Sequence, residues 1–207
     1  MPLAKKLIKF LSKIKYEVIS HRTVYTAFDK AKTLRVPEKI VGKTLVIKMN
    51  GGFALVLISA HQILDKAKFK KIVNGWRKKC MRAAQPSPSA RGMPAPYNPE
   101  GICSGRTRPC ELKLIKEIGF ASEAWMKKNL KGAKVGAIPP LGNLWPLARR
   151  GQRPGGGLPT FIEKSLIDQP KIIINGGDYN SSIKINSASL KKLIPDLVIG
   201  SFGKVRK

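Results

Sequence analysis

The stretch TLVIKMNGGFALVLIS, residues 44–59, decides the fold of this 207-residue chain. Residues 44–49 are rich in branched side chains, which favours a β-strand, and Asn50-Gly51-Gly52 is a turn signal. Residues 53–59 are typical of the returning strand. The sequence therefore predicts a β-hairpin over residues 44–59.

An amphipathic helix is predicted at the N-terminal end, over residues 3–14. One helical face carries Leu3, Leu7, Leu11 and Ile14, and lysines occupy much of the rest. A basic helix of this kind either packs on its own sheet or lies on a membrane surface. The first interpretation is favoured, because soluble domains use this pattern constantly.

The remaining predicted elements are short. We expect helices over residues 26–34, 64–73, 122–130 and 187–195, and strands over residues 16–20, 171–174, 182–186 and 197–199. Thr26 caps the first of these helices, Pro37 prevents its continuation, and residues 132–142 form a loop rich in Gly and Pro. Helices interspersed with hairpins predict an α/β (α+β) fold, with a mixed β-sheet and surrounding helices in a single domain.

Two segments differ from the rest in composition. Residues 77–110 and 146–157 hold eight of the eleven arginines and all three cysteines, and the first holds six of the fifteen prolines. Neither shows a usable apolar period, so both are expected to be looped or disordered insertions in a domain of residues 1–200. Residues 201–207 are expected to follow as a basic tail.

The charge balance points to an anionic partner. The chain carries 40 Lys and Arg against 12 Asp and Glu, a formal net charge of +28, which attracts nucleic acid or an anionic membrane surface. Lysines interrupt the apolar N-terminal residues, and no apolar run approaches the roughly 20 residues of a membrane span, so we expect a soluble, cytoplasmic protein. The cysteines form no CxxC pair, which argues against a zinc site and a disulfide framework.

Most familiar catalytic motifs are absent from the sequence, which has no GxSxG, HExxH or GxGxxG. Of its two histidines, His61 follows a strand and is expected to be structural, whereas the role of His21 stays open. Gly42-Lys43-Thr44 resembles the end of a Walker A loop, but Pro37 stands where that loop needs glycine. An ATPase of that type is therefore excluded.

Three features remain as a candidate site. They are Lys43 at a strand entry, the loop of residues 136–142, and Gly176-Gly177 at the end of another strand. Glycine-rich turns expose backbone N–H groups at close range. Two such turns and a lysine are able to cradle a phosphate or an oxyanion.

Five short motifs in a fixed order resemble the YbaK/EbsC family of aminoacyl-tRNA deacylases, which includes ProX-like prolyl-tRNA editing proteins. The motifs are HRTVYTA (21–27), VGKTLV (41–46), VGAIPPLG (135–142), LPT (158–160) and INGG (174–177). No single motif is specific, but the ordered set is. The similarity covers residues 1 to about 76 and 111 to about 200, interrupted only by the two arginine-rich segments.

The resemblance implies a mixed sheet with surrounding helices, no metal or organic cofactor, and hydrolysis of the ester that joins an amino acid to the terminal adenosine of tRNA. The implied partners are the acceptor end of an aminoacyl-tRNA and an aminoacyl-tRNA synthetase, with no membrane. The family often lacks a protein general base, and a hydroxyl of the substrate's ribose or its side chain helps to activate water. This suits a chain with two histidines.

The resemblance also assigns site residues. Lys43 and Gly136 take the catalytic roles, in which Lys43 holds the terminal phosphate or neighbouring polar atoms and the loop from Gly136 to Gly142 fixes the ester carbonyl. The implied substrate-binding residues are Tyr25, Thr26, Thr44, Ile138, Pro139, Pro140, Gly142, Gly176, Gly177 and Ser182. Family members can carry Asp or another polar residue near the position of Ser182, so the preferred amino acid stays open.

Three functions of different classes are consistent with the sequence. The leading hypothesis is trans-editing hydrolysis of a mischarged aminoacyl-tRNA. The second is a non-catalytic tRNA or nucleic-acid binder of the same fold, whose pocket the insertions have spoiled. The third is association with a membrane surface through the N-terminal helix.

Overall fold

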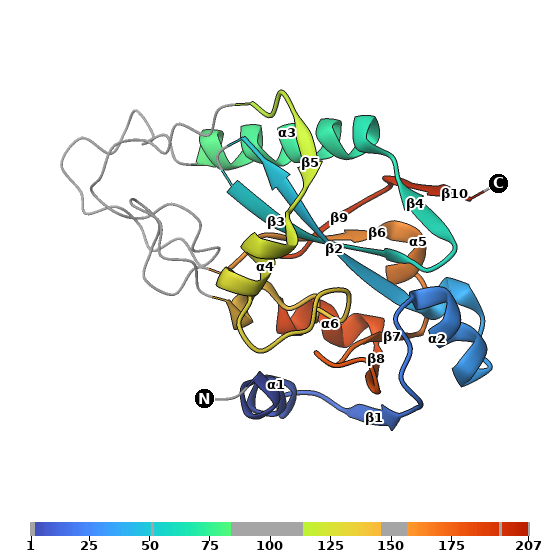
Figure 1. Cartoon of the computed structure of the whole chain (residues 1–207). Coiled ribbons are helices and arrows are strands. Elements are labelled where there is room, and N and C mark those ends of the chain that lie inside the picture. The colour runs from blue at the N-terminus through green and yellow to red at the C-terminus, as the bar shows by residue number, and fades with distance from the viewer. Residues whose placement is uncertain (1–2, 51, 84–113, 146–156, 195, 207) are drawn as a thin grey trace.

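The β2–β3 hairpin lies at the centre of the main sheet. In the computed structural model, which describes residues 3–50, 52–83, 114–145, 157–194 and 196–206, β2 (Gly42–Met49) pairs antiparallel with β3 (Gly52–Ser59). The sheet has the order β5-β2-β3-β6-β9, completed by β5 (Ile118–Phe120), β6 (Thr160–Glu163) and β9 (Val198–Gly200). The β3–β6 and β6–β9 pairs are parallel, so the sheet is mixed (Figure 1).

Two smaller sheets flank the main one. A three-stranded antiparallel sheet has the order β1-β8-β7, formed by β1 (Tyr16–Ser20), β8 (Ser181–Asn186) and β7 (Lys171–Asn175). A single parallel bridge from Val41 to Ile173 joins it to the start of β2. The other sheet pairs β4 (Gln62–Leu64) with β10 (Gly203–Val205).

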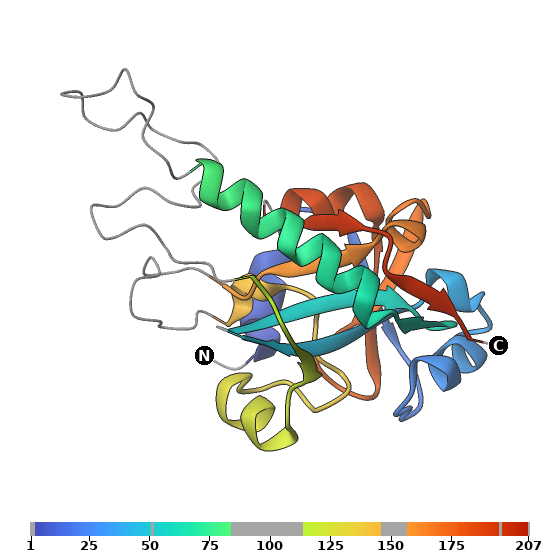
Figure 2. The same ribbon diagram turned by 90° about the horizontal axis from the view of Figure 1, so that it is seen from above.

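Helices cover both faces of the main sheet. They are α1 (Leu3–Leu11), α2 (Ala27–Leu34), α3 (Lys66–Ala83), α4 (Glu123–Asn129), α5 (Lys164–Ile167) and α6 (Ser187–Leu193), with short 3₁₀ turns η1 (Glu38–Ile40) and η2 (Gly142–Leu144). Figure 2 shows α3 lying across one face of the sheet. The Thr26 hydroxyl caps α2 by accepting the Asp29 N–H at 3.0 Å, and Arg35 ends that helix in the left-handed conformation (φ 51°).

Alternate residues of β3 serve two hydrophobic cores. Val56 and Ile58 pack beneath α3 with Phe69, whereas Leu55 and Leu57 belong to the larger cluster on the opposite face. Because successive side chains of a strand point to opposite faces, a strand buried on both sides is apolar at nearly every position. This explains why FALVLIS lacks the polar alternation of a half-exposed strand.

The predicted fold class is confirmed, because the chain forms one α+β domain with mixed sheets and helical cover. The hairpin, β1, the Thr26-capped helix and β7 were all predicted within two residues at each end. Helix α1 is shorter than predicted and ends at Leu11. The short elements β4, β5, β6, α5 and β10 were not predicted.

Two expectations about unusual segments need correction. Helix α3 continues to Ala83, so the first seven residues of the segment 77–110 are helical rather than looped. The helix extends because Arg77 and Cys80 are buried along it, at 4% and 6% exposed. Residues 84–110 and 146–156 lie outside the described residues. The predicted basic tail contains β10 and the fully buried Phe202.

Candidate functional site

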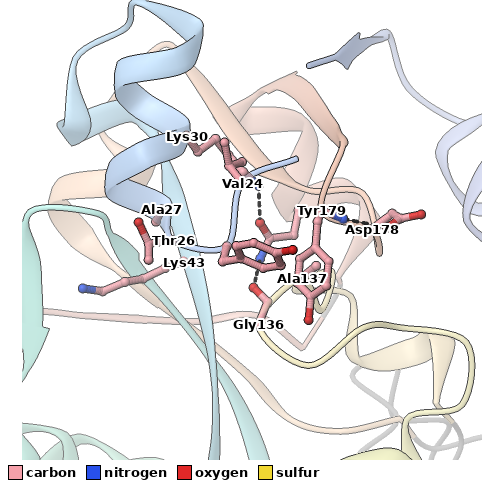
Figure 3. Close-up of a pocket in the computed structure, with 11 residues that line it drawn as sticks. Val24, Thr26, Ala27, Lys30, Lys43, Gly136, Ala137, Asp178 and Tyr179 are labelled. Atoms are coloured by element: carbon pink, nitrogen blue, oxygen red, sulfur yellow. Dashed lines mark hydrogen bonds between the residues drawn. The ribbon is translucent and has the colours of Figure 1, made fainter. Parts of the chain in front are cut away.

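A small pocket opens where four segments distant in sequence meet. It lies between the N-terminal end of α2, the first residues of β2, the loop that precedes η2 and the turn that follows β7 (Figure 3). Its free volume is about 30 Å³, the room of roughly one water molecule. The lining residues are Val24, Tyr25, Thr26, Ala27, Lys30, Lys43, Gly136, Ala137, Asn175, Asp178 and Tyr179.

Backbone hydrogen bonds fix the segment that leads into α2. The His21 N–H donates to the Asn180 carbonyl and the Val24 N–H to the Tyr179 carbonyl, both at 3.0 Å. The Tyr25 ring, 71% exposed, meets Tyr179 edge to face with centroids 4.9 Å apart. Tyr25 therefore presents an exposed aromatic ring to the pocket from a backbone segment that these hydrogen bonds hold in place.

Lys30, Asn175 and Gly136 form a continuous polar chain through the pocket. The Lys30 ammonium donates to Oδ1 of Asn175 at 2.6 Å, and Nδ2 of Asn175 donates to the carbonyls of Gly136 at 3.3 Å and Ile138 at 3.4 Å. Lys30 is 5% exposed, and desolvation by burial lowers its pKa from 10.5 to about 8. The side-chain amide of Asn175, at the end of β7, thus links α2 to the Gly136 loop.

Lys43 lines the same pocket from the start of β2, with its ammonium turned outward. Its Nζ donates to the Ala60 carbonyl at 3.2 Å, and Figure 3 shows it directed away from Gly136. Burial and then the nearby Arg206 lower the pKa of Lys43, while Glu38 opposes them. Among the described residues, one hydrogen bond, to a neutral carbonyl, holds this cation, so a substrate anion is able to compete for it.

Asp178 is the carboxylate of the pocket. Its Oδ1 lies 2.7 Å from the ammonium of Lys134, and that hydrogen bond is the main cause of a lowered pKa for Asp178. A carboxylate held in its charged form by a cation is a weak proton acceptor. No three His, Cys, Asp or Glu side chains within the described ranges are grouped as metal ligands would be.

Gly136 and Gly142 bound the loop in different ways. Gly136 has φ +88°, and the nearest atom to an added Cβ is the Tyr25 carbonyl oxygen at 3.9 Å, so backbone conformation rather than space favours glycine. At Gly142 an added Cβ would lie 1.8 Å from the Leu158 carbonyl oxygen. Gly142 is therefore required by packing and does not line the pocket.

The structure brings together some of the predicted site residues. Tyr25, Thr26, Lys43 and Gly136 line the pocket. The other predicted substrate-binding residues do not line it: Thr44, Ile138, Pro139, Pro140, Gly142, Gly176, Gly177 and Ser182. Several of them support it from behind, since Ile138 accepts from Asn175, Gly177 accepts from the Lys134 N–H, and Ser182 bonds Nε2 of His21 at 2.9 Å.

Sequence reasoning missed Lys30, Asn175, Asp178 and Tyr179, all of which line the pocket. One signal was available for Lys30, because it lies four residues after the capping residue Thr26 and therefore on the same helical face. Asn175 directly follows a predicted apolar strand, at the position where strand ends commonly place polar side chains in a site.

A wider hollow adjoins the pocket and shares Val24 and Tyr25 with it. Its volume is about 270 Å³, and its other lining residues are Arg22, Thr23, Asp29 and Lys32. Two cations, Arg22 and Lys32, therefore share the lining of the hollow with the exposed Tyr25. The inner pocket accommodates only a small group, whereas the outer hollow has room for a larger one.

Comparison of the sequence with protein-family models and with curated proteins finds no match. Solved structures do resemble the fold. A "putative trans-editing enzyme for prolyl tRNA synthetase" aligns with TM-score 0.64 and 16% identity over 99% of this chain and 98% of its own. A hypothetical protein, APE2540, gives 0.63 and 16% over 98% and 99%, and a designed epitope scaffold 0.64 and 16% over 100% and 99%.

These similarities define the class of fold. The chain shares its fold, over nearly its whole length, with the structure described as a "putative trans-editing enzyme for prolyl tRNA synthetase". None of the helices in the described part of the chain is long and apolar enough to span a bilayer.

Proposed function

We propose that the protein is an aminoacyl-tRNA deacylase of the YbaK/prolyl-tRNA-editing type, which hydrolyses the ester of a mischarged tRNA. The observation that carries this proposal is the pocket that joins Lys43 and Gly136, with Tyr25 and Thr26 beside them. These four residues come from motifs that resemble the family, and they meet although more than 90 residues separate Lys43 from Gly136. The fold shared with a trans-editing protein supports the same interpretation.

The chemistry proposed for the pocket needs little from the protein beyond positioning and charge. Lys43 exchanges the Ala60 carbonyl for a phosphate or another polar atom of the terminal adenosine. The Gly136 N–H has no hydrogen-bond partner among the described residues and is available to the ester carbonyl oxygen. Water adds to the carbonyl carbon, the ester C–O bond breaks, and the amino acid and the tRNA hydroxyl are released.

No strong protein base lines the pocket in the described part of the chain. Its carboxylate, Asp178, is held by Lys134, and neither histidine is among the lining residues. Activation of water by a hydroxyl of the substrate is therefore the mechanism that we propose. The limited free volume of the inner pocket favours a small aminoacyl side chain.

The outer hollow suits the nucleotide part of the substrate. Arg22 and Lys32 supply positive charge, and the exposed face of Tyr25 is available to stack on a base. Single-stranded RNA ends are bound by this combination of cations and aromatic rings. The net charge of +28 adds long-range attraction for tRNA.

A deacylation panel tests the proposal. tRNA(Pro) charged with Ala or Cys, and tRNA charged with Ser or Thr, are incubated with wild-type protein and with folded Lys43→Ala. We expect hydrolysis of at least one small aminoacyl ester, with a loss of about 100-fold in the variant. Rates equal to the protein-free background across the panel would refute the enzyme. Tight tRNA binding without hydrolysis would instead favour the non-catalytic binder.

A further inference from the structure

Lys30 is a buried cation that has no role in the reaction proposed above. It lies on α2 with 5% of its surface exposed, and it is one of the residues that line the pocket. No ion pair within the described ranges includes it. The carboxylates that line the pocket and the adjoining hollow are otherwise engaged, because Asp29 accepts from the Thr26 hydroxyl and Asp178 pairs with Lys134.

The hydrogen bonding of Lys30 is incomplete. An ammonium has three N–H donors, and the only acceptor it meets in the described part of the chain is Oδ1 of Asn175 at 2.6 Å. The Asn175 amide cannot rotate to accommodate it further, since Nδ2 is held by the carbonyls of Gly136 and Ile138. Two N–H groups of a desolvated cation are therefore left for an atom that enters the pocket.

A purely structural role does not explain a lysine at this position. Burying an uncompensated charge is unfavourable, and methionine has a similar length and flexibility without the charge. Buried cations that lack a carboxylate partner and line a cavity are concentrated at functional sites. Lys30 enters the pocket from α2, at the top of Figure 3, whereas the ammonium of Lys43 is turned outward and points to the left.

We propose that Lys30 contacts the substrate directly, and that Asn175 positions its ammonium to hold an anionic oxygen of the substrate. This inference rests on the proposed function and extends it. The oxygen is either a phosphate oxygen of the terminal nucleotide or the oxyanion that forms when water adds to the ester carbonyl. Both have the same chemistry toward an ammonium, and the experiment separates them.

Several charged and titratable groups line the same pocket as Lys30, but burial is what lowers its pKa. Lys43 faces the pocket from β2, the Asp178–Lys134 pair from the turn after β7 and the loop before Gly136, and the phenols of Tyr25 and Tyr179 close the remaining side. Because burial lowers the pKa of Lys30 to about 8, its cation is lost as the pH rises through that value. Protein-dependent activity should fall with it.

The test uses full-length Lys30→Met and Lys30→Arg, with Lys171→Met as the matched control. Lys171 is exposed and begins β7, the strand that Asn175 ends. Single-turnover deacylation of the best substrate in the panel is measured from pH 6.5 to 8.5 after subtraction of the protein-free rate. Binding of AMP, whose phosphate represents that of the terminal adenosine, is followed by NMR titration.

We expect Lys30→Met to lower kcat/KM about 100-fold, Lys30→Arg to lower it about tenfold, and the control to stay within twofold. The order of the two variants is decisive, because a packing role would make the uncharged, flexible Met the better tolerated. A lower kcat with unchanged AMP binding assigns the oxyanion, and a higher KM with weaker AMP binding assigns the phosphate. We also expect Lys30→Arg to lose the decline of activity near pH 8.

Two outcomes separate this inference from the proposed function. Wild-type hydrolysis that Lys30→Met leaves unchanged in rate, pH profile and AMP affinity would overturn the role of Lys30 while the deacylase stands. Lys30-dependent AMP binding by a wild type that hydrolyses nothing would overturn the deacylase and support the anion site. Circular dichroism of each variant confirms that the fold is kept.

Discussion

The ammonium of Lys30 lies 2.6 Å from Oδ1 of Asn175, although 145 residues separate the two in the chain. The contact joins α2 to the end of β7 in the interior of the pocket. Because burial lowers the pKa of Lys30 from 10.5 to about 8, the charged lysine destabilises the fold at neutral pH by about 3 kcal/mol. The free energy of unfolding, measured as a function of pH, should therefore report on the charge of Lys30.

Lys30→Met should raise the free energy of unfolding at pH 7 by about 1–2 kcal/mol, because the charge is removed but the Asn175 oxygen loses its donor. In the wild type the pKa is lower in the folded than in the unfolded state, so stability rises as the pH increases from 8 to 10.5. The advantage of the variant should therefore shrink by about 2 kcal/mol at pH 9.5. Urea unfolding of the wild type and of Lys30→Met at pH 7 and at pH 9.5 measures this difference in stability. A difference that does not depend on pH would contradict the lowered pKa of Lys30.

Lys43→Ala should remove most deacylation, by about 100-fold in single-turnover rate, while changing the free energy of unfolding by less than about 1 kcal/mol. The side chain is half-buried and makes one hydrogen bond, to the Ala60 carbonyl. Lys43→Arg should recover little of the deacylation activity, since the wide, planar guanidinium of arginine replaces the compact ammonium of lysine. Wild-type activity in the folded alanine variant would show that Lys43 is not a site residue.

Substitution by alanine should affect mainly stability at Gly142 and mainly activity at Gly136. At Gly142 the new Cβ would meet the Leu158 carbonyl oxygen, so we expect a loss of stability of about 3 kcal/mol or more. At Gly136 only the positive φ is unfavourable, which costs about 1–2 kcal/mol, and the main effect should be on activity. Thermal unfolding and single-turnover assays separate the two. Gly75→Ala, in open space on α3, is the control and should be neutral or slightly stabilising.

Phe202→Ala should lower the free energy of unfolding by about 3–5 kcal/mol. Phe202 is fully buried against Phe69, and Oε2 of the buried Glu163 accepts its backbone N–H at 2.6 Å. Val205→Ala, at a neighbouring position that is 62% exposed, should change stability by less than about 0.5 kcal/mol. Urea unfolding of both variants measures the difference, and equal effects would contradict the packing of Phe202.

Deletion of residues 84–110 with a short Gly/Ser linker should preserve the domain. Deletion of residues 77–110 should not, because it removes the helical turn that carries the buried Arg77 and Cys80. We expect the free energies of unfolding of the two deletion variants, measured with urea, to differ by several kcal/mol. A domain equally stable in both would show that the end of α3 contributes nothing.

The parts of the fold that the sequence predicted are those with local signals. The hairpin has a turn of Asn and Gly between apolar runs, and α2 has Thr26 as a capping residue. The strands β4, β5 and β6 have three or four residues each, and their pairing depends on neighbours that are distant in the chain. Residues 77–83 were predicted as a loop for the same reason, because no local signal in the sequence indicates that Arg77 and Cys80 are buried.

The candidate site follows the same rule. Lys43 and Gly136 lie in motifs that resemble a family, so they could be named in advance. Lys30 could not, because a lysine on a short amphipathic helix is normally solvated, and only the approach of Asn175 and the Gly136 loop buries it. The burial of Lys30 therefore depends on tertiary structure alone.

The pairing of β1 with β8, in which Tyr16 is opposite Ile185, has a consequence for the order of events during synthesis. The pocket needs residues 21–30 and residues 175–179 together, so it cannot exist on the ribosome until most of the chain has been made. Contacts between such distant residues slow folding, typically into the range of milliseconds to seconds. During that interval β3 lacks its partner strand β6, and the hairpin face that carries Leu55 and Leu57 lacks the apolar side chains of β7 and β8, so this face is open to aggregation and to chaperones. A prematurely terminated chain that ends before β7 would therefore contain the hairpin and Lys43 but no pocket.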